Sequence, residues 1–124
     1  MRYLILLLAI MAPTFAGAFD PRDTFTTEKV LAEYNSDSQS EFVYKVYAIA
    51  VTETLQVADA FNTHLGVAQQ FCMPSNVSLS SDMLISMVNV EVENARNRGE
   101  YTDYATTHFP LVALLTLNKF FPCK

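Results

Sequence analysis

The sequence of 124 residues has few of the residue types that build catalytic and ligand-binding sites. Its three scattered glycines cannot form the glycine-rich loop with which many enzymes hold phosphate groups. Its only histidines, His64 and His108, lack a metal-binding spacing such as H-E-x-x-H, so we expect each at a helix end or on the surface. The sequence therefore predicts no catalytic residue, no metal site and no cofactor.

The acidic pair Glu91 and Glu93 does not change this interpretation. Side chains two residues apart on a helix point to different faces, so these two cannot work together as an acid and a base. We expect both to be solvated. The chain is therefore predicted not to be an enzyme, unless folding places one of the histidines beside a carboxylate in a cleft.

Basic residues are scarce as well. Eight lysines and arginines stand against thirteen aspartates and glutamates, which gives a net charge of -5. Proteins bind nucleic acid largely by neutralising phosphates with lysine and arginine. An acidic chain without a basic cluster lacks that electrostatic footprint, and we expect no nucleic-acid partner.

The first residues have the pattern of an export signal. Arg2 precedes an apolar run, Tyr3–Met11, which is followed by the small residues Ala16–Ala18 that signal peptidase favours. The run is shorter than the roughly 20 apolar residues of a membrane-spanning helix. We therefore predict a cleaved signal peptide over residues 1–18 and an exported domain over residues 19–124, with no membrane attachment after cleavage. Loss of Arg2 leaves seven basic and thirteen acidic residues, a net charge of -6.

Only two cysteines are present, Cys72 and Cys123, and they lie far apart in the sequence. Disulfides persist in the oxidising compartments that receive exported proteins, so a structural disulfide is the simplest interpretation. Closing this long loop removes conformational entropy from the unfolded chain, worth roughly 4 kcal/mol. The alternative is a redox or nucleophilic thiol, which usually has a Cys-x-x-Cys partner or a basic neighbour. Neither occurs in the local sequence.

The segment from Ser38 to Phe61 is expected to be the longest helix. It contains no glycine or proline, opens with the capping-box spacing of Ser38 and Glu41, and repeats apolar residues at the helical period. Lys45, Glu53 and Gln56 lie between these apolar positions and are expected to face solvent. The predicted apolar stripe consists of Val43, Val46, Tyr47, Ala50, Val57, Ala58 and Phe61.

A second helix is predicted from Ser78 or Ser80 to Gly99, with Arg96 and Arg98 near its negative end. Its Val88–Val92 stretch also alternates like a strand, but no second strand is apparent to pair with it. The residues expected to point inward are Met83, Leu84, Met87, Val88, Val90 and Val92.

Two further helices complete the predicted fold. A short one is expected near Thr27–Tyr34. Another is expected over Pro110–Phe121, with Pro110 in its first turn, and its nearly continuous apolar sequence predicts a place in the core. The sequence thus predicts an all-α fold, a small bundle of about four helices with one disulfide.

Three stretches together resemble a known family. They are YAIAVTETLQVADAF (Tyr47–Phe61), FCMPSNVSL (Phe71–Leu79) and FFPCK (Phe120–Lys124), and their order and spacing are similar to those of the Rap/Tai proteins. These are the immunity proteins of type VI secretion amidase effectors. The F-C-x-P motif with a distant F-P-C is the most specific part of this resemblance.

The resemblance implies a periplasmic helical protein, in many members a homodimer. It also implies a partner, a peptidoglycan amidase effector from a neighbouring cell, which the immunity protein binds and inhibits. An acidic surface suits this function because complementary charge would speed capture of a basic toxin. Two alternatives stay open: an exported structural or assembly protein with the same scaffold, and an inhibitor of another cell-wall hydrolase.

The connection between the last two long helices, Arg96–His108, is the predicted binding surface. It contains Arg96, Arg98, Tyr101 and Tyr104. Tyrosine and arginine are enriched among the residues that dominate binding energy in protein interfaces. The competing interpretation of this segment is an ordinary solvent-exposed loop.

Overall fold

A computed structural model describes residues 24–124 of the chain. Within this range the chain forms five helices and no strand, and one disulfide joins Cys72 to Cys123. The all-α prediction with one disulfide is confirmed. The predicted signal peptide over residues 1–18, with the first residues of the predicted domain, lies outside the described residues. The helices are α3 (Thr27–Glu33), α4 (Glu41–Leu65), α5 (Ser81–Asn97), α6 (Tyr101–Thr106) and α7 (Phe109–Phe120).

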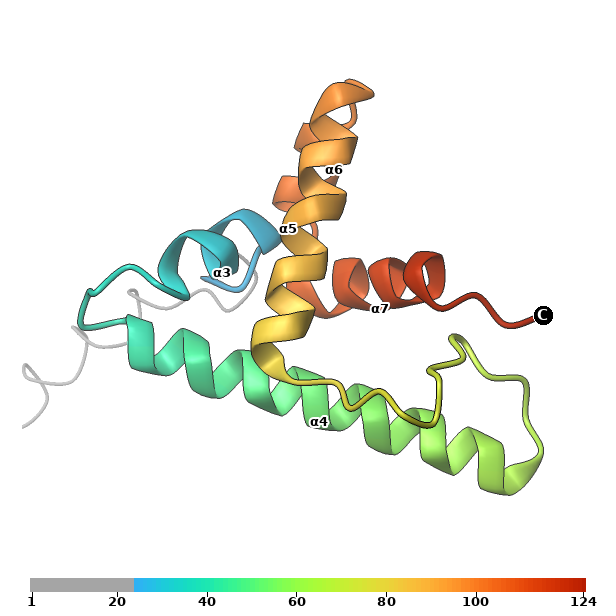
Figure 1. Ribbon diagram of the computed structural model, residues 1–124. Coiled ribbons are helices and arrows are strands. Elements are labelled where there is room, and N and C mark those ends of the chain that lie inside the picture. Colours follow the sequence, from blue (N-terminus) through green and yellow to red (C-terminus); the bar gives the residue numbers. More distant parts are fainter. Residues whose placement is uncertain (1–23) are drawn as a thin grey trace, which may run out of the picture.

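The helix α5 stands at the centre of the arrangement. It packs against α4, α6 and α7, and α3 also packs against these three helices (Figure 1). The long helix α4 runs across the base of α5, and α6 lies beside the far end of α5. The side chains buried most completely come from α3, α5 and α7, and include Val30, Leu84, Val88, Phe109 and Leu117.

The predicted limits of α5 are confirmed. The helix begins after Ser80, whose side-chain oxygen accepts a hydrogen bond of 3.1 Å from the backbone N–H of Met83. Gly99 follows its end with a φ of +77°, a left-handed conformation that glycine adopts without strain. Leu84, Met87, Val88 and Val92 are buried as expected. Val90 was expected to point inward but is 50% exposed, because a step of two residues turns it away from Val88.

The predicted burial pattern of α4 is wrong. The helix buries Tyr44, Ala48, Val51 and Thr52 instead of the predicted stripe. Of that stripe only Tyr47 is partly buried against the core, and the other six residues are exposed. The reason is that α4 carries apolar residues on two sides, and α3 and α5 cover only the side that contains Tyr44 and Ala48.

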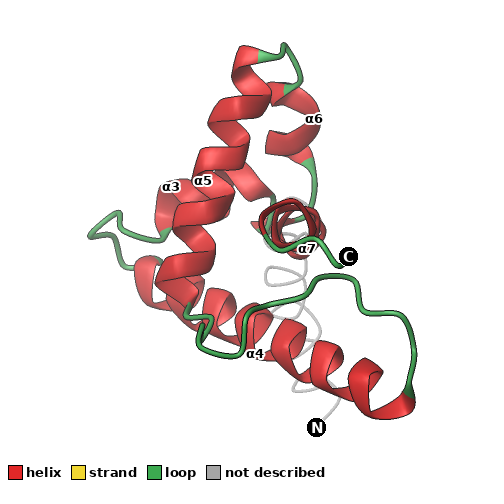
Figure 2. Ribbon diagram, turned by 45° about the vertical axis from the view of Figure 1, so that its right-hand side comes forward, coloured by secondary structure: helices red, strands yellow, loops and turns green. Residues whose placement is uncertain are grey.

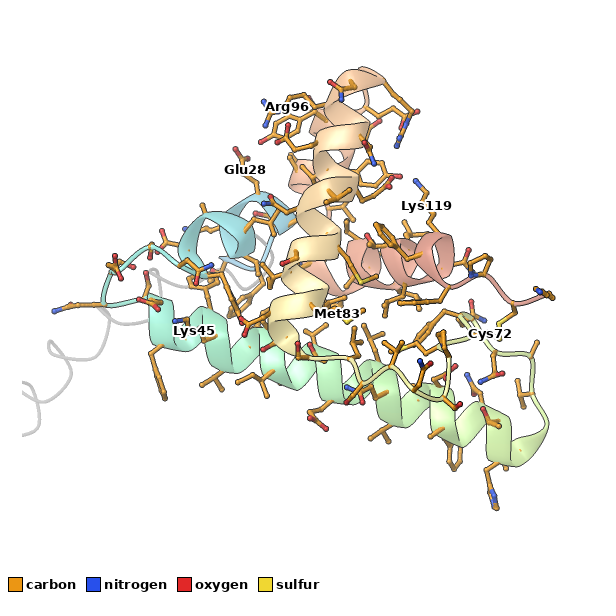
Figure 3. The ribbon with its side chains drawn as sticks, viewed as in Figure 1. Glu28, Lys45, Cys72, Met83, Arg96 and Lys119 are labelled. Carbon is orange, nitrogen blue, oxygen red and sulfur yellow. A yellow bond between two sulfur atoms is a disulfide. The ribbon has the colours of Figure 1, made fainter. Side chains whose placement is uncertain are left out.

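The polar side chains of α4 also depart from expectation in part. Glu53 is exposed, as expected. Gln56 is partly buried and donates a hydrogen bond of 2.8 Å to the backbone oxygen of Leu79, which attaches the helix to the start of α5. Lys45 is partly buried, pairs with Glu41 and lies over the ring of Tyr34, the residue that follows α3 (Figure 3).

The turn before α4 is organised by Glu33 rather than by a capping box. Glu33 Oε2 accepts hydrogen bonds from three serine hydroxyls, those of Ser36, Ser38 and Ser40, at 3.2, 2.9 and 2.6 Å. These bonds, from Ser40 most strongly, lower the pKa of the Glu33 carboxyl. Ser40 precedes the helix, and its side chain makes no capping hydrogen bond. The three serines therefore connect α3 to α4.

The helix α7 is half-buried. Pro110 lies in its first turn, as predicted. Phe109, Val112, Ala113, Thr116 and Leu117 face the core, whereas Leu111, Leu115 and Phe120 are exposed. Its apolar surface is therefore larger than the core can cover.

Two long-range connections join distant parts of the chain. Near α3, the backbone N–H and side-chain hydroxyl of Thr27 donate to the carbonyl oxygen of Thr107 at 2.9 and 2.8 Å, and the N–H of Phe109 donates to Phe25 O. At the other end, the disulfide ties Cys123 to the loop 66–80, which passes between α4 and α7 (Figure 2). In the range 24–124 no helix combines the length and the apolar character that a membrane crossing requires.

Candidate interaction surface

The segment predicted as the binding surface is largely helical rather than a loop. Residues 101–106 form α6, which folds back beside the last turns of α5. Together they project from the body of the molecule at the end opposite to α4 (Figure 1). We call this projection the α5–α6 tip and define it by Arg96, Arg98, Glu100, Tyr101 and Tyr104.

Arg96 and Tyr101 form one ordered pair of the tip. The guanidinium carbon of Arg96 lies 4.1 Å from the centroid of the Tyr101 ring, a cation–π geometry. The Tyr101 hydroxyl donates a hydrogen bond of 3.2 Å to Glu28 Oε1 of α3, which lies on the same side of the molecule as Arg96 (Figure 3). Arg96 Nε also lies 3.3 Å from Glu93 Oε2.

Arg98 and Tyr104 are connected through a buried carboxylate. Arg98 Nη2 donates to Glu91 Oε1 at 3.0 Å, and Arg98 Nε donates to Glu100 Oε2 at 2.9 Å. Lys119 of α7 donates to the same oxygen of Glu91 and, at 3.0 Å, to the hydroxyl of Tyr104. This network joins α5, α6 and α7 at the base of the tip.

The expectation that Glu91 is solvated is wrong. Its side chain is only 5% exposed. Burial on its own raises the pKa of a carboxyl, but the hydrogen bonds from Lys119 and Arg98 outweigh this effect and lower the pKa of Glu91. Glu91 in turn raises the pKa of Lys119, as does Tyr104 to a lesser degree. The carboxylate and its two cations therefore stay charged at neutral pH.

Of the four predicted binding residues, Arg96 and Tyr101 thus contact each other, whereas Arg98 and Tyr104 are joined through Glu91 and Lys119. Arg96 and Arg98 keep about half of their side chains exposed, and both tyrosines are partly exposed. Beside them, Tyr104, Leu111 and Leu115 line a hollow of about 200 Å³ between α6 and α7. The role of the tip residues in binding stays a prediction.

A second surface, the outward side of α4, was not predicted from the sequence. We call it the apolar α4 face and define it by Phe42, Val46, Ile49, Val57 and Phe61, of which Phe42 is 74% and Phe61 59% exposed. The side chains that project from α4 away from the other helices are mostly carbon (Figure 3). The signal that could have revealed this face is a second apolar set, Tyr44, Ala48, Val51 and Leu55, at the same helical spacing.

Two shallow hollows adjoin the apolar α4 face. One has a volume of about 400 Å³ and is lined by Glu53, Thr54, Val57, Ala58 and Phe61. The other has a volume of about 280 Å³ and reaches from Ala50 and Thr54 to Pro110 at the start of α7. Glu53 is the only acidic or basic side chain that lines them. The arrangement suits contact with another apolar surface.

The two histidines lie where the sequence placed them. His64 is in the last turn of α4 and His108 immediately precedes α7, and both are exposed. Neither lies in a group of three or more histidine, cysteine, aspartate or glutamate side chains that could hold a metal ion, since residues 24–124 contain no such group.

Comparison of the chain with protein-family models, with curated proteins and with solved structures finds no match. The resemblance to the Rap/Tai proteins therefore remains a prediction from three sequence stretches. The function is therefore inferred from the geometry of the two surfaces described above.

Proposed function

We propose that this chain is a periplasmic immunity protein that binds and inhibits a peptidoglycan amidase effector of type VI secretion, with the α5–α6 tip as its contact surface. The observation that carries the proposal is the ordered arrangement of Arg96, Arg98, Tyr101 and Tyr104 on a projecting part of the molecule. The proposed class of target comes from the resemblance to the Rap/Tai proteins.

Ordering before contact favours tight binding. Each flexible side chain that becomes fixed in an interface costs about 0.5–1.5 kcal/mol of conformational entropy. In the tip, Arg96 already lies over Tyr101, and Tyr104 already accepts a hydrogen bond from Lys119. Folding therefore already fixes these side chains, so that binding costs less conformational entropy. Their exposed parts remain free to contact a partner.

The disulfide supports an extracytoplasmic location, because such bonds persist in oxidising compartments. The excess of acidic residues supports a basic target through faster association. An inhibitor of another cell-wall hydrolase would use the same charge and the same kind of surface. An exported structural or assembly protein would have no amidase partner at all.

The test titrates the purified chain by calorimetry into a panel of type VI secretion amidases and, separately, into other peptidoglycan hydrolases. We expect one amidase to bind and to lose activity. The double variant Tyr101→Ala/Tyr104→Ala should then weaken binding by about 30-fold or more, the loss expected when residues at an interface centre are truncated. Phe120→Ala is the matched control, because it removes a partly exposed aromatic ring at the far end of α7.

The outcomes separate the three functions. Binding only to a hydrolase of another class supports the second alternative, and the absence of any hydrolase partner supports a structural role. If an amidase binds and both variants bind it equally well, the tip is not the contact surface. Circular dichroism of the tyrosine variant checks that α6 still forms.

A further inference from the structure

A hollow between α6 and α7 lies beside the predicted binding residues of the α5–α6 tip. Tyr104 of the tip lines it together with Leu111 and Leu115 of α7. Its volume of about 200 Å³ is below the roughly 300–1,000 Å³ of pockets that hold a small-molecule ligand. The hollow therefore has the size to accept one side chain of a partner protein rather than a cofactor or a substrate.

The α7 side of the hollow is apolar and accessible. Leu111, Val112 and Leu115 are the residues of α7 that line it. Val112 is buried, but Leu111 and Leu115, one helical turn apart, are 52% and 45% exposed. An occupant is therefore favoured when an apolar part of about 5.4 Å, the length of one turn, covers both leucines.

The α6 side of the hollow offers acceptors of hydrogen bonds. Asp103 is the only acidic or basic side chain that lines the hollow. It is exposed, and within residues 24–124 its carboxylate makes no hydrogen bond or ion pair. Thr107, which also lines the hollow, donates its hydroxyl hydrogen to the backbone oxygen of Asp103, so its hydroxyl oxygen can only accept. These two groups favour an occupant that donates hydrogen bonds and carries positive charge.

Lys119 of α7 does not supply this donor. Its side chain points toward the tip (Figure 3), but its ammonium group binds the buried carboxylate of Glu91 and the hydroxyl of Tyr104. Lys119 is also not one of the residues that line the hollow. The negative charge of Asp103 therefore remains for a partner.

We infer that the hollow receives a lysine or arginine side chain of the partner that the tip binds. The inference rests on the proposed function and specifies the kind of residue that the amidase presents to the tip. The aliphatic part of this side chain covers Leu111 and Leu115, and its cationic end donates to Asp103. Lysine and arginine are the side chains that combine an apolar stem with a charged donor. A purely apolar side chain would leave the Asp103 carboxylate partly desolvated without a partner.

The two arginines of the tip do not oppose a basic partner. Arg96 pairs with Glu93, and Arg98 pairs with Glu91 and Glu100, so carboxylates within the protein compensate both positive charges. The charge of Asp103 is not compensated in this way. Complementary charges in an interface speed association and fix the orientation of the partner. The hollow thus gives the attraction between an acidic chain and a basic partner a defined place.

Capped amino acids test the hollow without any amidase. The methyl groups of the leucines in the purified chain are observed by nuclear magnetic resonance during titration with acetyl-arginine methylamide and with its lysine, norleucine and glutamate counterparts. We expect the arginine and lysine compounds to shift the methyl signals of Leu111 and Leu115, norleucine to shift them less, and glutamate to leave them unchanged. Leu65, which is 56% exposed at the end of α4, is the control signal and should not shift.

The variant Asp103→Asn separates charge from shape in the same measurement. It keeps the size of the side chain and removes its charge, so the arginine and lysine compounds should then shift Leu111 and Leu115 no more than norleucine does. Equal shifts with all four compounds overturn the inference. It is overturned equally if Asp103→Asn leaves the preference for the basic compounds intact.

A charge exchange tests the contact with the amidase itself, by calorimetry. Asp103→Lys should raise the dissociation constant by about 100-fold, because two cations then meet in the hollow. Glu53→Lys is the matched control, since it makes the same change in net charge at an exposed position of α4, and it should raise the constant by less than about 3-fold. Circular dichroism checks that α6 still forms in Asp103→Lys.

The partner residue is found by restoring the interaction. Each exposed lysine or arginine of the amidase is replaced in turn by glutamate, and one of these variants should bind Asp103→Lys more tightly than the natural amidase does. If none does so, or if Asp103→Lys binds as well as the natural protein, the inference is wrong. If no amidase binds the natural protein, the proposed function fails, and the capped amino acids still decide whether the hollow accepts a basic side chain.

Discussion

The helices α4 and α5 are both amphipathic, but they use their apolar residues differently. α5 buries seven of its 17 residues, whereas α4 buries four of 25. The difference follows from their places in the fold, since α5 is surrounded by α4, α6 and α7, while α4 lies at the base and packs against α3 and α5. The apolar residues of a helix indicate how much surface has to be buried. The place of the helix in the fold decides whether other helices of the same chain bury that surface.

The two helices also differ in how they are held. α5 is fixed along its length by buried side chains and by the ion pairs of Glu91. Beyond Leu55 α4 contributes no fully buried side chain, and the loop that follows it is tied to the end of α7 by the disulfide. The disulfide therefore adds a covalent tie to this part of the molecule, in which Phe71 and Leu79 of the loop are the side chains that reach the core.

The largest expected effect comes from removing that covalent tie. Cys72→Ser/Cys123→Ser should lower the free energy of unfolding by about 4 kcal/mol, because the bond closes a long loop in the unfolded chain. Urea denaturation measures this change. Hydrogen exchange should show the greatest loss of protection in residues 56–80 and in the last turn of α7. An equal loss of protection in α5 would contradict the division into two differently held regions.

Replacing one apolar side chain by alanine on each helix tests the difference in burial between α4 and α5. Leu84→Ala on α5 removes a fully buried side chain and should cost about 3 kcal/mol of unfolding free energy. Ile49→Ala on α4 removes a side chain that is half exposed and should cost less than about 0.5 kcal/mol. Both costs are measured by urea denaturation. Equal costs would show that the α4 face is buried in the monomer.

The carboxylates of the two helices give the next prediction. Glu91→Gln on α5 should cost about 1.5 kcal/mol at neutral pH, since hydrogen bonds between charged groups are lost but both cations are partly solvated. Glu53→Gln on α4 is the exposed control and should change little.

The effect of Glu91→Gln has a defined pH dependence. Because the folded-state pKa of Glu91 lies below the ordinary value of about 4.3, its stabilisation is fully present above that value and is lost as the pH falls through the folded-state pKa. The stabilities of the natural protein and Glu91→Gln, measured by urea denaturation, should therefore converge on acidification. A constant difference down to the lowest pH would contradict the charged network.

Costs below those of Leu84→Ala and Glu91→Gln are expected at a feature that the two helices share. Gly66 follows the last residue of α4 and Gly99 lies two residues after the end of α5, with φ values of +66° and +77°. A methyl group added to either glycine meets no atom within 4 Å, so alanine suffers only from the left-handed backbone. Gly66→Ala and Gly99→Ala should each lower the free energy of unfolding by about 1 kcal/mol, measured by thermal denaturation. A much larger cost at one site would indicate a contact that this backbone argument omits.

Local signals in the sequence predicted most helix limits. Ser80 and Gly99 marked the limits of α5 and Pro110 the start of α7, because capping residues act within one turn. α6 was missed, because a helix of six residues has no periodic signal of its own and depends on its contacts with α3 and α5.

The surfaces were harder to predict than the helices. Nothing near Glu91 in the sequence indicates that Lys119, from another helix, neutralises it in the core. The two apolar sides of α4 have the same spacing, so periodicity could not decide which of them the rest of the chain would cover. Both errors concern tertiary contacts, which local patterns do not contain.

The pairing of Thr27 with Thr107 has a consequence for the order of events during synthesis. Thr27, at the start of the first described helix, is synthesised early, but its hydrogen-bond partner Thr107 follows 80 residues later. Cys72 can likewise form its disulfide only after Cys123 has been synthesised. The hydrogen bonds between Thr27 and Thr107 and the disulfide can therefore form only after residues 107–123 have been synthesised, whereas the contacts of α5 with α4 and α6 need no residue beyond 106.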